Sequence, residues 1–518
     1  MSSVQLCNFI ISFKLFWKMW NGACACVCLE FGCWGNGKMD SRLVPRCATR
    51  LRVCRRMTHI YLILICTVGL SFYLLWFAVS DDEENRRSVV TQTRTKRSRR
   101  HRFRRDADAP APRRPTSLYY DKHTVPDNFS QWSSSARSTC AGRLIGYGEE
   151  FALLKNVVID RTHCRCRRLG GEPINFVLNQ EESDEYYSAD FGCFQLPCIQ
   201  FQLYFFSAEN AHLNTWMNAL KADRDVASVD VHQINEFTIA VQRYEYVNLY
   251  HTMTDWYNAF LVMQFFGRNA QETNIVIFDS HPYGSLDSVW PQLFNSTFRL
   301  SALPVKSRFR RMVWSIVGYS SPIKTYSSPY PPLLEEFRTF FLSSFDVKAD
   351  RRTDCGKRLS VLFLWRRDYV AHPRNPSGFV QRKIRNEAKL INYVRQKMPE
   401  VDVRGVQIDA LAMRDQLELI VSTDILVGVH GAGLTHAIFL PRGAGLLELL
   451  PNAMWETSEH FEAIASWRRL VYLRWTNNDI VLENESQGLL TVPLRVVTAC
   501  LRRIRRQMCS KSLWCLVV

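Results

Sequence analysis

The chain has 518 residues, of which 47% are hydrophobic and 22% charged, and its formal net charge is +17. The apolar content excludes a wholly disordered protein, and the length allows two or three domains. The charge would suit a nucleic-acid-binding protein, but residues 86–114 alone hold twelve Arg or Lys against two Asp and so supply +10 of it. The basic character is therefore concentrated in one short segment.

A membrane anchor is predicted near the N-terminus. Residues 60–79 form a run of twenty residues without a charge, which is long enough to cross a bilayer as a helix. Arginines precede the run at positions 50, 52, 55 and 56, and four acidic residues follow it at 81–84. The positive-inside rule then predicts a type II signal anchor at 57–79, with residues 1–56 as a cytosolic tail. A cleaved signal peptide and a true start at Met57 stay open as alternatives.

Residues 80–136 are predicted to form a disordered stem, because they combine low complexity and prolines with no apolar period. The stem holds two dibasic motifs, RTKR at 94–97 and RFRR at 102–105, that are typical of secretory convertase sites. Cleavage there would release a shed form, whereas the alternative is a solvated basic spacer. A lumenal stem accounts for the charge, so nucleic acid is not an expected partner.

Cysteines and glycosylation motifs also favour a lumenal body. Nine cysteines follow the stem, and an oxidising compartment would pair most of them. Except for His163, no histidine lies near the cluster Cys164–Cys198, so disulfides are preferred over a metal site, although the pairing cannot be deduced. Sequons for N-glycosylation occur at Asn128, Asn295 and Asn484. The cysteines concerned are Cys140, Cys164, Cys166, Cys193, Cys198, Cys355, Cys500, Cys509 and Cys515.

The body is predicted to be a mostly parallel α/β protein in two halves. The first half, residues 137–333, contains expected strands at 238–243 and 274–279 and an expected helix at 250–266 between them. The second half, residues 334–500, begins with a buried strand at 359–364, and residues 501–518 form a basic tail. A proline-rich stretch at 327–333 is the expected hinge.

The first half carries the segment YEYVNLYHTMTDWY at 244–257, which is rich in groups that suit a sugar. On a helix that starts near Asn248, His251 and Asp255 are four residues apart and share one face. A carboxylate beside an imidazole can deprotonate an acceptor hydroxyl. The alternative is that the two side chains form a local pair at a domain seam. Glu245 and Trp256 are further acceptor-side candidates.

The second half carries WRRDYVAHPR at 365–374, directly after a buried strand. Arg366 and Arg367 stand where the end of a strand meets a ligand, and their guanidinium groups suit a diphosphate. Arg382 is a second candidate for the same contact. The alternative is that these are surface arginines paired with Asp368 or Glu387.

A third motif, VGVHGAGLTHAIFLP at 427–441, predicts a strand, a glycine turn and a helix start. It is flanked by an expected helix at 413–421 and by strands at 425–429 and 445–450. His430 stands at the carboxyl end of a strand, where open α/β sheets bind ligands. The alternative is that the glycines serve only a tight turn.

These three blocks, in this order, resemble glycosyltransferase family 61, and within it the members that transfer xylose to N-glycans. The resemblance covers roughly residues 140–480. It implies that His251 and Asp255 match the acceptor-side block, with Asp255 the preferred catalytic base and His251 the reserve. The positions that it assigns to the donor side are Arg366, Arg367, Arg382, Asn386, Glu387, His430, Gly431, Ala432, Gly433, Thr435 and Glu448.

The resemblance also implies a GT-B-like fold of two Rossmann-like domains facing a cleft, and inverting transfer in the Golgi. The implied donor is UDP-xylose and the implied acceptor is the core β-mannose of N-glycans. Transfer of N-acetylglucosamine or xylose to another acceptor and a non-catalytic Golgi lectin stay open, as does a homodimer. No cofactor or essential metal is expected. DxD letters occur only at Asp106 with Asp108 and at Asp223 with Asp225, and neither pair follows an apolar strand.

Overall fold

The computed structural model describes residues 34–35, 38–39, 128–200, 211–324, 330–348, 351–452 and 459–512. The expected anchor at 57–79, both dibasic motifs, Asp106 with Asp108 and most of the tail and stem lie outside these ranges. None of the described helices is both long and apolar enough to cross a bilayer. The chain divides into two compact units, residues 1–116 and 117–518. In the first unit only β1 (Trp34–Gly35) and β2 (Lys38–Met39) are described, and they pair antiparallel.

The first half of the second unit, which we call the first lobe (residues 136–324), is built on a mixed sheet. Its strand order is β12-β11-β10-β13-β5-β4-β3, and β8 pairs with both β5 and β9. The strands are β3 (Ala136–Thr139), β4 (Leu144–Tyr147), β5 (Phe151–Asp160), β8 (Phe194–Leu196), β9 (Leu220–Ala222), β10 (His232–Val241), β11 (Thr273–Ile277), β12 (Ser296–Arg299) and β13 (Lys306–Trp314).

Only part of this first sheet is parallel. Strands β12, β11, β10 and β13 run parallel, but β13 pairs antiparallel with β5, as β5 does with β4 and β4 with β3. The links β3–β4 and β4–β5 are tight turns, with left-handed backbone at Gly142 and Gly148. Turns this short can join only antiparallel neighbours. The expected Rossmann-like sheet is therefore incomplete in this lobe.

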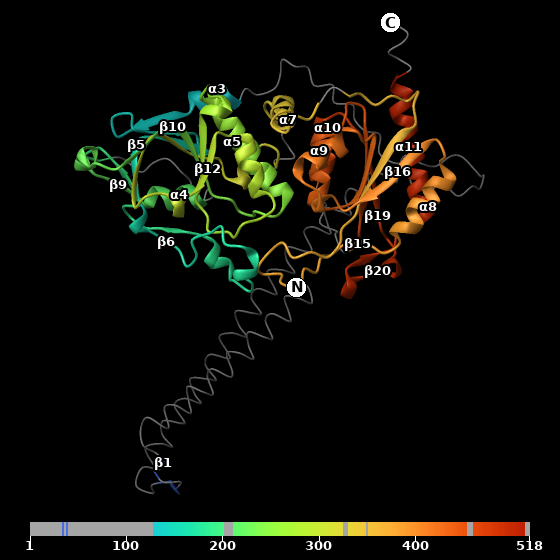
Figure 1. The fold of residues 1–518 in the computed structure, drawn as a ribbon, viewed down its shortest axis with the longest axis horizontal. Coiled ribbons are helices and arrows are strands. Elements are labelled where there is room, and N and C mark those ends of the chain that lie inside the picture. The colour runs from blue at the N-terminus through green and yellow to red at the C-terminus, as the bar shows by residue number, and fades with distance from the viewer. Residues whose placement is uncertain are drawn as a thin grey trace, which may run out of the picture. The chain divides into compact units, whose positions relative to one another are not determined.

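The second lobe (residues 359–512) has a fully parallel sheet with strand order β16-β14-β17-β18-β19. Its strands are β14 (Leu359–Leu364), β16 (Val401–Val406), β17 (Ile425–Val429), β18 (Gly445–Leu450) and β19 (Val471–Thr476). The strands expected at 359–364, 425–429 and 445–450 and the helix expected at 413–421 are confirmed with the same bounds. Figure 1 shows this lobe in orange and red.

Helices cover the two sheets. They are α3 (Asn128–Ser134), α4 (Ala211–Asn218), α5 (Leu249–Phe265), α6 (Trp290–Leu293), α7 (Leu334–Ser343), α8 (Glu387–Lys397), α9 (Met413–Val421), α10 (His460–Trp467) and α11 (Leu494–Ser512). Short pairs and a small sheet add β6 (Cys164–Arg165), β7 (Ser188–Ala189), β15 (Lys383–Ile384), β20 (Glu483–Asn484) and β21 (Leu489–Leu490).

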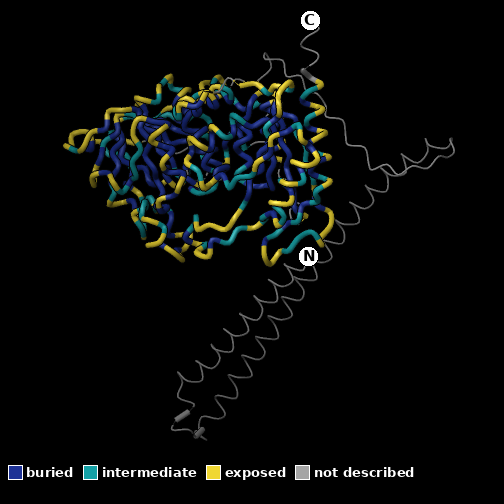
Figure 2. The backbone as a smooth tube through the Cα atoms, turned by 45° about the vertical axis from the view of Figure 1, so that its right-hand side comes forward, coloured by how far each residue is buried: buried dark blue, intermediate teal, exposed yellow. Residues whose placement is uncertain are grey.

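The core of the second lobe follows the two-residue period of a strand. Val361 and Phe363 of β14 pack with α8 and α11 on one face of the sheet, whereas Leu362 and Leu364 pack on the other face with α9. Because both faces are covered, the strands read as continuous apolar runs. Figure 2 shows the buried backbone of both lobes in dark blue.

Helix α5 is buried on almost every side, including Tyr257, Asn258 and Phe260. It contacts β10 and the 3-10 turn Gly318–Ser320 of its own lobe, and also the 3-10 helix Ala432–Phe439 of the second lobe. A helix that is apolar all round must be covered all round. Helix α5 therefore lies where the two lobes meet.

Three disulfides are present among the described residues. Cys140 pairs with Cys198, Cys164 with Cys193, and Cys355 with Cys509. The expectation that disulfides rather than a metal use these cysteines is confirmed for these six. Cys166 and Cys500 are free thiols, and Cys515 lies outside the described ranges.

Candidate active site

The second lobe has a topological switch point beside β14. The chain leaves β14 towards β16 on one side and returns to β17 on the other, so the loops after these strands diverge. Ligands of open α/β sheets bind in the crevice that such a divergence opens. A cavity of about 380 Å³ lies there.

The cavity is lined by both lobes. The second lobe contributes Leu364, Trp365, Arg366, Arg367, Tyr369, Val380, Ile408, Asp409, Ala410, Leu411, Ala412, Met413, Gln416, Val429, Ala432, Gly433, Leu434 and His436. The first lobe contributes Val247, Leu249, Ser285, Leu286 and Ser288. Apolar walls with a few polar groups at the ends of strands are typical of a small-molecule site.

Arg366 is the least compensated cation of this cavity. Its Nε donates a 3.1 Å hydrogen bond to the carbonyl oxygen of Gln381, and the ion pairs of the described residues do not include it. Burial lowers the pKa of the Arg366 guanidinium, because a buried cation is poorly solvated. The charge of an anionic ligand would compensate the guanidinium for the solvation that it loses on burial. Arg367, by contrast, is more than half exposed and pairs with Glu387 at 2.7 Å, as the surface alternative predicted.

The glycine turn gives Arg366 its space. A Cβ atom at Gly431 would lie within 3.0 Å of Nη1 of Arg366, whereas one at Gly433 would meet only Leu364 at 3.6 Å. The helix expected after the turn is a 3-10 helix, Ala432–Phe439. Bonds from residue i to i+3 keep the turn tight, and His436 is fixed in it by the carbonyl of Gly433 (2.9 Å) and by Gln416 (3.0 Å).

Arg382, Asn386 and Thr435 were also assigned to the donor side. Nη1 of Arg382 donates to the carbonyl oxygen of His430 at 2.6 Å, and burial lowers the pKa of Arg382 to about 10. Asn386 bonds the backbone of Val492 in both directions, at 2.8 and 3.0 Å, so its side chain holds a loop. Thr435 is fully buried. Arg382 is thus close to the glycine turn, while Asn386 and Thr435 have structural surroundings.

His430 is oriented by Glu448, as a neighbouring strand brings the two together. Its Nδ1 bonds the Glu448 carboxylate, which also accepts from Tyr472 and from Nε of Arg474. Burial alone would raise the pKa of Glu448, but the bonds from His430 and Tyr472 hold it below its usual value. Glu448 is fully buried and so acts on His430 rather than on a ligand.

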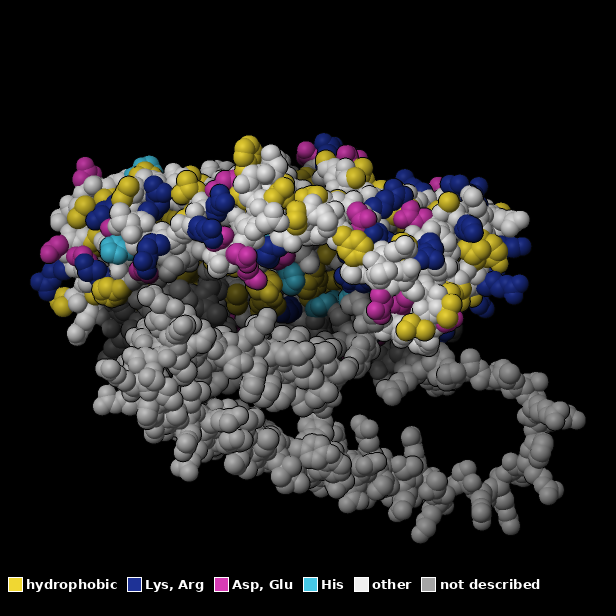
Figure 3. All heavy atoms as spheres, turned by 90° about the horizontal axis from the view of Figure 1, so that it is seen from below, with side chains coloured by type: hydrophobic (Ala, Val, Ile, Leu, Met, Phe, Trp, Pro, Cys, Tyr) yellow, Lys and Arg dark blue, Asp and Glu magenta, His cyan; other side chains and the backbone are white. Residues whose placement is uncertain are grey.

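His251 lies in the first turn of α5 among aromatic rings. The ring centroids of Tyr244, Tyr250 and Tyr319 are 5.7, 5.6 and 6.0 Å from that of its imidazole. Burial lowers the pKa of His251, and the charge of Lys324 lowers it further while Glu245 opposes both. The imidazole is therefore neutral near pH 7 and able to accept a proton. Figure 3 shows histidine side chains in a recess on one face.

The other acceptor-side candidates are placed differently. Asp255 is only 3% exposed, and burial raises its pKa well above the usual value. Neither Asp255 nor His251 is among the residues that line the cavity. Trp256 is fully buried and packs against Phe341 in the core, so the structure corrects its assignment to a ligand surface. Asn248 caps α5 by accepting from the amide of Tyr250 at 3.0 Å. Glu245 is half-buried and accepts from the amides of Tyr246 and Val247.

Some site residues were missed from the sequence. His460 on α10 bonds Tyr250 on α5 through Nδ1 at 2.9 Å, and burial lowers the pKa of His460 to about 4. Tyr319 and Lys324 stand beside His251, with Nζ of Lys324 3.3 Å from the Tyr319 ring centroid. His460, Tyr319 and Lys324 all lie outside the three sequence motifs at 244–257, 365–374 and 427–441. His436, by contrast, was visible in the third motif and was not selected.

Sequons and candidate metal ligands complete the survey. Asn295 is exposed and Asn484 is partly exposed. Asp223 caps a 3-10 turn through the amide of Asp225 and pairs with Lys221 at 2.9 Å, so this DxD pair has a structural partner. Within the described residues no group of three or more His, Cys, Asp or Glu is arranged to hold a metal ion.

Comparison with known proteins agrees with the geometry. Residues 249–447 match the family model described as glycosyltransferase 61. The chain is 27% identical over 343 residues to a β-1,2-xylosyltransferase of Oryza sativa subsp. japonica, covering 58% of this chain and 63% of the relative. It is 26% identical over 312 residues to the β-1,2-xylosyltransferase of Arabidopsis thaliana, covering 50% of this chain and 58% of the relative.

A second kind of relative shares a shorter region. The EGF domain-specific O-linked N-acetylglucosamine transferase of Rattus norvegicus is 26% identical over 246 residues, covering 44% of this chain and 43% of the relative. The chain thus spans less than two thirds of each of these relatives. The matched region runs from the first turn of α5 into β18 and includes His251, Arg366 and His430. Residues 249–447 of this chain therefore resemble a glycosyltransferase 61 domain.

Proposed function

We propose that this protein is an inverting glycosyltransferase that moves xylose from UDP-xylose to the core β-mannose of N-linked glycans, in β-1,2 linkage. The observation that carries the proposal is the cavity at the β14–β17 switch point, with the poorly compensated cation Arg366 in its wall. The family match and the two xylosyltransferase relatives support the same reaction class. Two α/β lobes that share one cavity are consistent with a GT-B-like fold.

In this mechanism the nucleotide occupies the cavity and its diphosphate contacts Arg366, with Arg382 and the glycine turn beside it. The guanidinium charge of Arg366 stabilises the UDP that leaves. Because inversion needs one base and no covalent intermediate, the acceptor hydroxyl attacks the anomeric carbon directly as its proton is removed. A base must reach that proton, which favours the half-buried His251 over the 3% exposed Asp255.

The identity of the sugar donor has an alternative. The O-linked N-acetylglucosamine transferase relatives favour UDP-N-acetylglucosamine and a different acceptor. Xylose lacks the C6 hydroxymethyl group of N-acetylglucosamine, so the two donors differ in the space that they need. A lectin that kept the fold without catalysis is a third candidate, and it predicts glycan binding without UDP binding.

The test is a transfer assay with the full-length chain made in a secretory host. The protein is incubated with UDP-xylose or UDP-N-acetylglucosamine, and with either a biantennary N-glycan peptide or a folded EGF domain, and product masses are measured. A pentose gain on the core mannose supports the proposal. An N-acetylhexosamine gain on the EGF domain would replace it with the rival. We expect EDTA to leave the activity unchanged, and loss of activity that manganese restores would contradict a metal-free mechanism.

We also propose that the protein is a single-pass type II protein of the Golgi membrane, anchored by residues 57–79. The disulfides and the exposed sequon at Asn295 support a lumenal body. Glycosidase-sensitive mass at Asn295 and protease protection of the body in sealed Golgi vesicles would test this topology. A body that protease digests in sealed vesicles would contradict it.

A further inference from the structure

Residues 366–381 form an arm that leaves the end of β14 and returns to β15. The arm is braced internally. The amide of Tyr369 donates to the carbonyl of Gly378 at 2.9 Å, and the amide of Val380 donates to Oδ1 of Asp368 at 2.9 Å. Gly378 has φ +69°, and a Cβ atom there would lie 2.8 Å from the carbonyl carbon of Tyr369. The arm therefore moves as one piece more easily than it bends.

The base of the arm is a wall of the proposed nucleotide cavity. Arg366, Arg367, Tyr369 and Val380 all line it. The first lobe lines the same cavity through Val247, Leu249 and the 285–288 turn. The distance between arm and first lobe consequently sets the width of the cavity.

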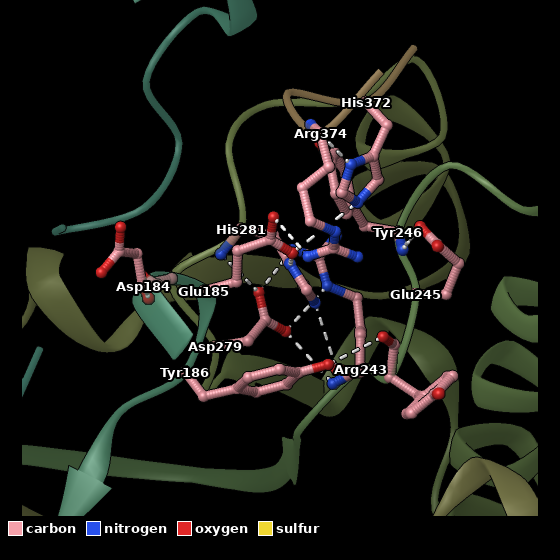
Figure 4. A network of polar contacts seen from close by, with 12 residues as sticks. Asp184, Glu185, Tyr186, Arg243, Glu245, Tyr246, Asp279, His281, His372 and Arg374 are labelled. Carbon is pink, nitrogen blue, oxygen red and sulfur yellow. Dashed lines mark hydrogen bonds and ion pairs between the residues drawn. The ribbon is translucent and has the colours of Figure 1, made fainter. Parts of the chain in front are cut away.

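Two side chains at the tip of the arm meet one buried carboxylate of the first lobe, Glu185. Nη1 of Arg374 lies 2.8 Å from Oε1 of Glu185, and Nε2 of His372 lies 3.7 Å from Oε2. The carbonyl of Pro373 between them accepts from the amide of Asn179 at 2.9 Å. Figure 4 shows His372 and Arg374 coming from one segment towards Glu185.

Glu185 is held rigidly on the first-lobe side. Its side chain is fully buried, and Oε2 lies 2.8 Å from Nδ1 of His281. Nε2 of His281 faces the carbonyl oxygen of Arg243 at 3.3 Å. Arg243 is itself buried and fixed by Asp279 at 2.7 Å and by Asp287. A buried charge with such partners is costly to move, so the carboxylate is a fixed anchor.

The same network leads to the other wall of the cavity. Arg243 directly precedes the segment 244–249 that carries Glu245 and ends at the cavity residue Leu249. Tyr246 in that segment stacks on His281 with centroids 4.7 Å apart, and its ring lies 5.5 Å from that of His372. One polar network thus contacts the tip of the arm and the acceptor-side segment together (Figure 4).

We propose that Glu185 is a positioning residue that latches the arm 366–381 onto the first lobe and so fixes the wall of the nucleotide cavity. This rests on the proposed function for the identity of the ligand. Glu185 does not line the cavity, and it acts through Arg374 and His372. Loss of Glu185 frees the arm, so part of the binding free energy of the nucleotide must then be used to order the arm.

The test compares Glu185→Gln and Arg374→Met with the control Asp184→Asn in the full-length chain. Asp184 is the neighbouring buried carboxylate, but it pairs with Arg167 of its own lobe at 3.1 Å. We expect the dissociation constant of UDP, measured by calorimetry, and KM for the sugar nucleotide to rise at least about tenfold in both latch variants. KM for the acceptor should change less, and the double variant should be no worse than the worse single one. Asp184→Asn should bind UDP as the wild type does.

Hydrogen exchange gives a measurement that needs no ligand. The amide of Asn179 in the first lobe bonds the carbonyl of Pro373 at the tip of the arm, whereas the amide of Tyr369 bonds Gly378 within the arm. Peptides that contain Asn179 should exchange faster in Glu185→Gln and Arg374→Met, while peptides that contain Tyr369 and peptides from β17 and α8 should not. Unchanged exchange at Asn179 would overturn the latch, and so would unchanged UDP binding in folded variants. If wild-type protein does not bind UDP, the proposed function fails, and the exchange result still decides the latch.

Discussion

Tyr250 on α5 and His460 on α10 join the two lobes through a hydrogen bond of 2.9 Å between the phenol oxygen and Nδ1. Since burial lowers the pKa of His460 to about 4, its ring is neutral at pH 7, and Nδ1 can accept a hydrogen bond from the Tyr250 hydroxyl. His251 is the next residue after Tyr250, and the two rings lie 5.6 Å apart. The contact between the lobes and the candidate base therefore share one turn of helix.

Tyr250→Phe should lower both stability and turnover. Removing the hydroxyl takes this bond from the partly buried His460, at a cost of about 0.5–1.5 kcal/mol. We expect a melting temperature lower by a few degrees and a reduced kcat for transfer, measured by thermal unfolding and by product mass. A variant with wild-type melting and wild-type kcat would show that this contact is dispensable.

His251→Ala should lower kcat by about 10²–10⁴-fold and leave UDP binding unchanged, because a base acts on the acceptor proton only in the transition state. His232→Ala is the matched control, since His232 is an exposed histidine of the same lobe. Equal turnover in the two variants would remove His251 from the role of base.

The pH profile tests the same residue by another route. A base works when deprotonated, and burial holds the pKa of His251 below its usual value of 6.5. The plateau of kcat/KM should therefore extend below pH 6.5 and fall only at more acidic pH. A fall in kcat/KM that begins above pH 6.5 would mean either that another group is the base or that the pKa of His251 is not lowered.

Gly431→Ala and Gly433→Ala should differ, although they are two positions apart in one turn. The new methyl at 431 would occupy the place of Nη1 of Arg366, whereas the methyl at 433 meets only ordinary contact with Leu364. We expect UDP to bind about tenfold or more weakly to Gly431→Ala and with little change to Gly433→Ala, as calorimetry would show. Equal UDP affinities in the two variants would show that Arg366 does not contact the nucleotide.

The disulfide between Cys355 and Cys509 ties the segment before β14 to α11, across 154 residues of sequence. Replacing both cysteines with serine should lower stability by about 2–4 kcal/mol, since the cross-link restricts the unfolded chain. Transfer activity at 25 °C should persist, because neither residue lines the cavity. Chemical unfolding with and without the pair would measure the effect.

Much of the second lobe could be predicted from the sequence, and the reason is its burial. The strands at 359–364, 425–429 and 445–450 are covered on both faces, so each reads as an apolar run of the right length. The position of Arg366 at the edge of the sheet, where it lines the cavity, followed from the rule that such strands end at a binding crevice. The first lobe was harder to predict from the sequence. Its strands β3, β4 and β5 pair antiparallel through short turns, and local sequence patterns do not reveal that strand order.

The polar network around Glu185 could not be predicted. Glu185, Arg243, His281 and Arg374 are far apart in the chain, and a charged residue in a sequence is usually a solvated one. Only the fold reveals that Glu185, Arg243 and His281 are buried together and that the partly exposed Arg374 pairs with Glu185. Asp255 shows the converse, since its spacing from His251 fitted a ligand face but α5 is buried on almost every side.

The measurement that tests the central claim most directly is the anomeric configuration of the product. Full-length protein is incubated with UDP-xylose and a biantennary N-glycan peptide, and the purified product is examined by NMR beside the product of His251→Ala. We predict a β-linked xylose on the core mannose with the wild type and almost none with the variant. An α-linked product, or no transfer by folded protein that binds UDP, would contradict the account.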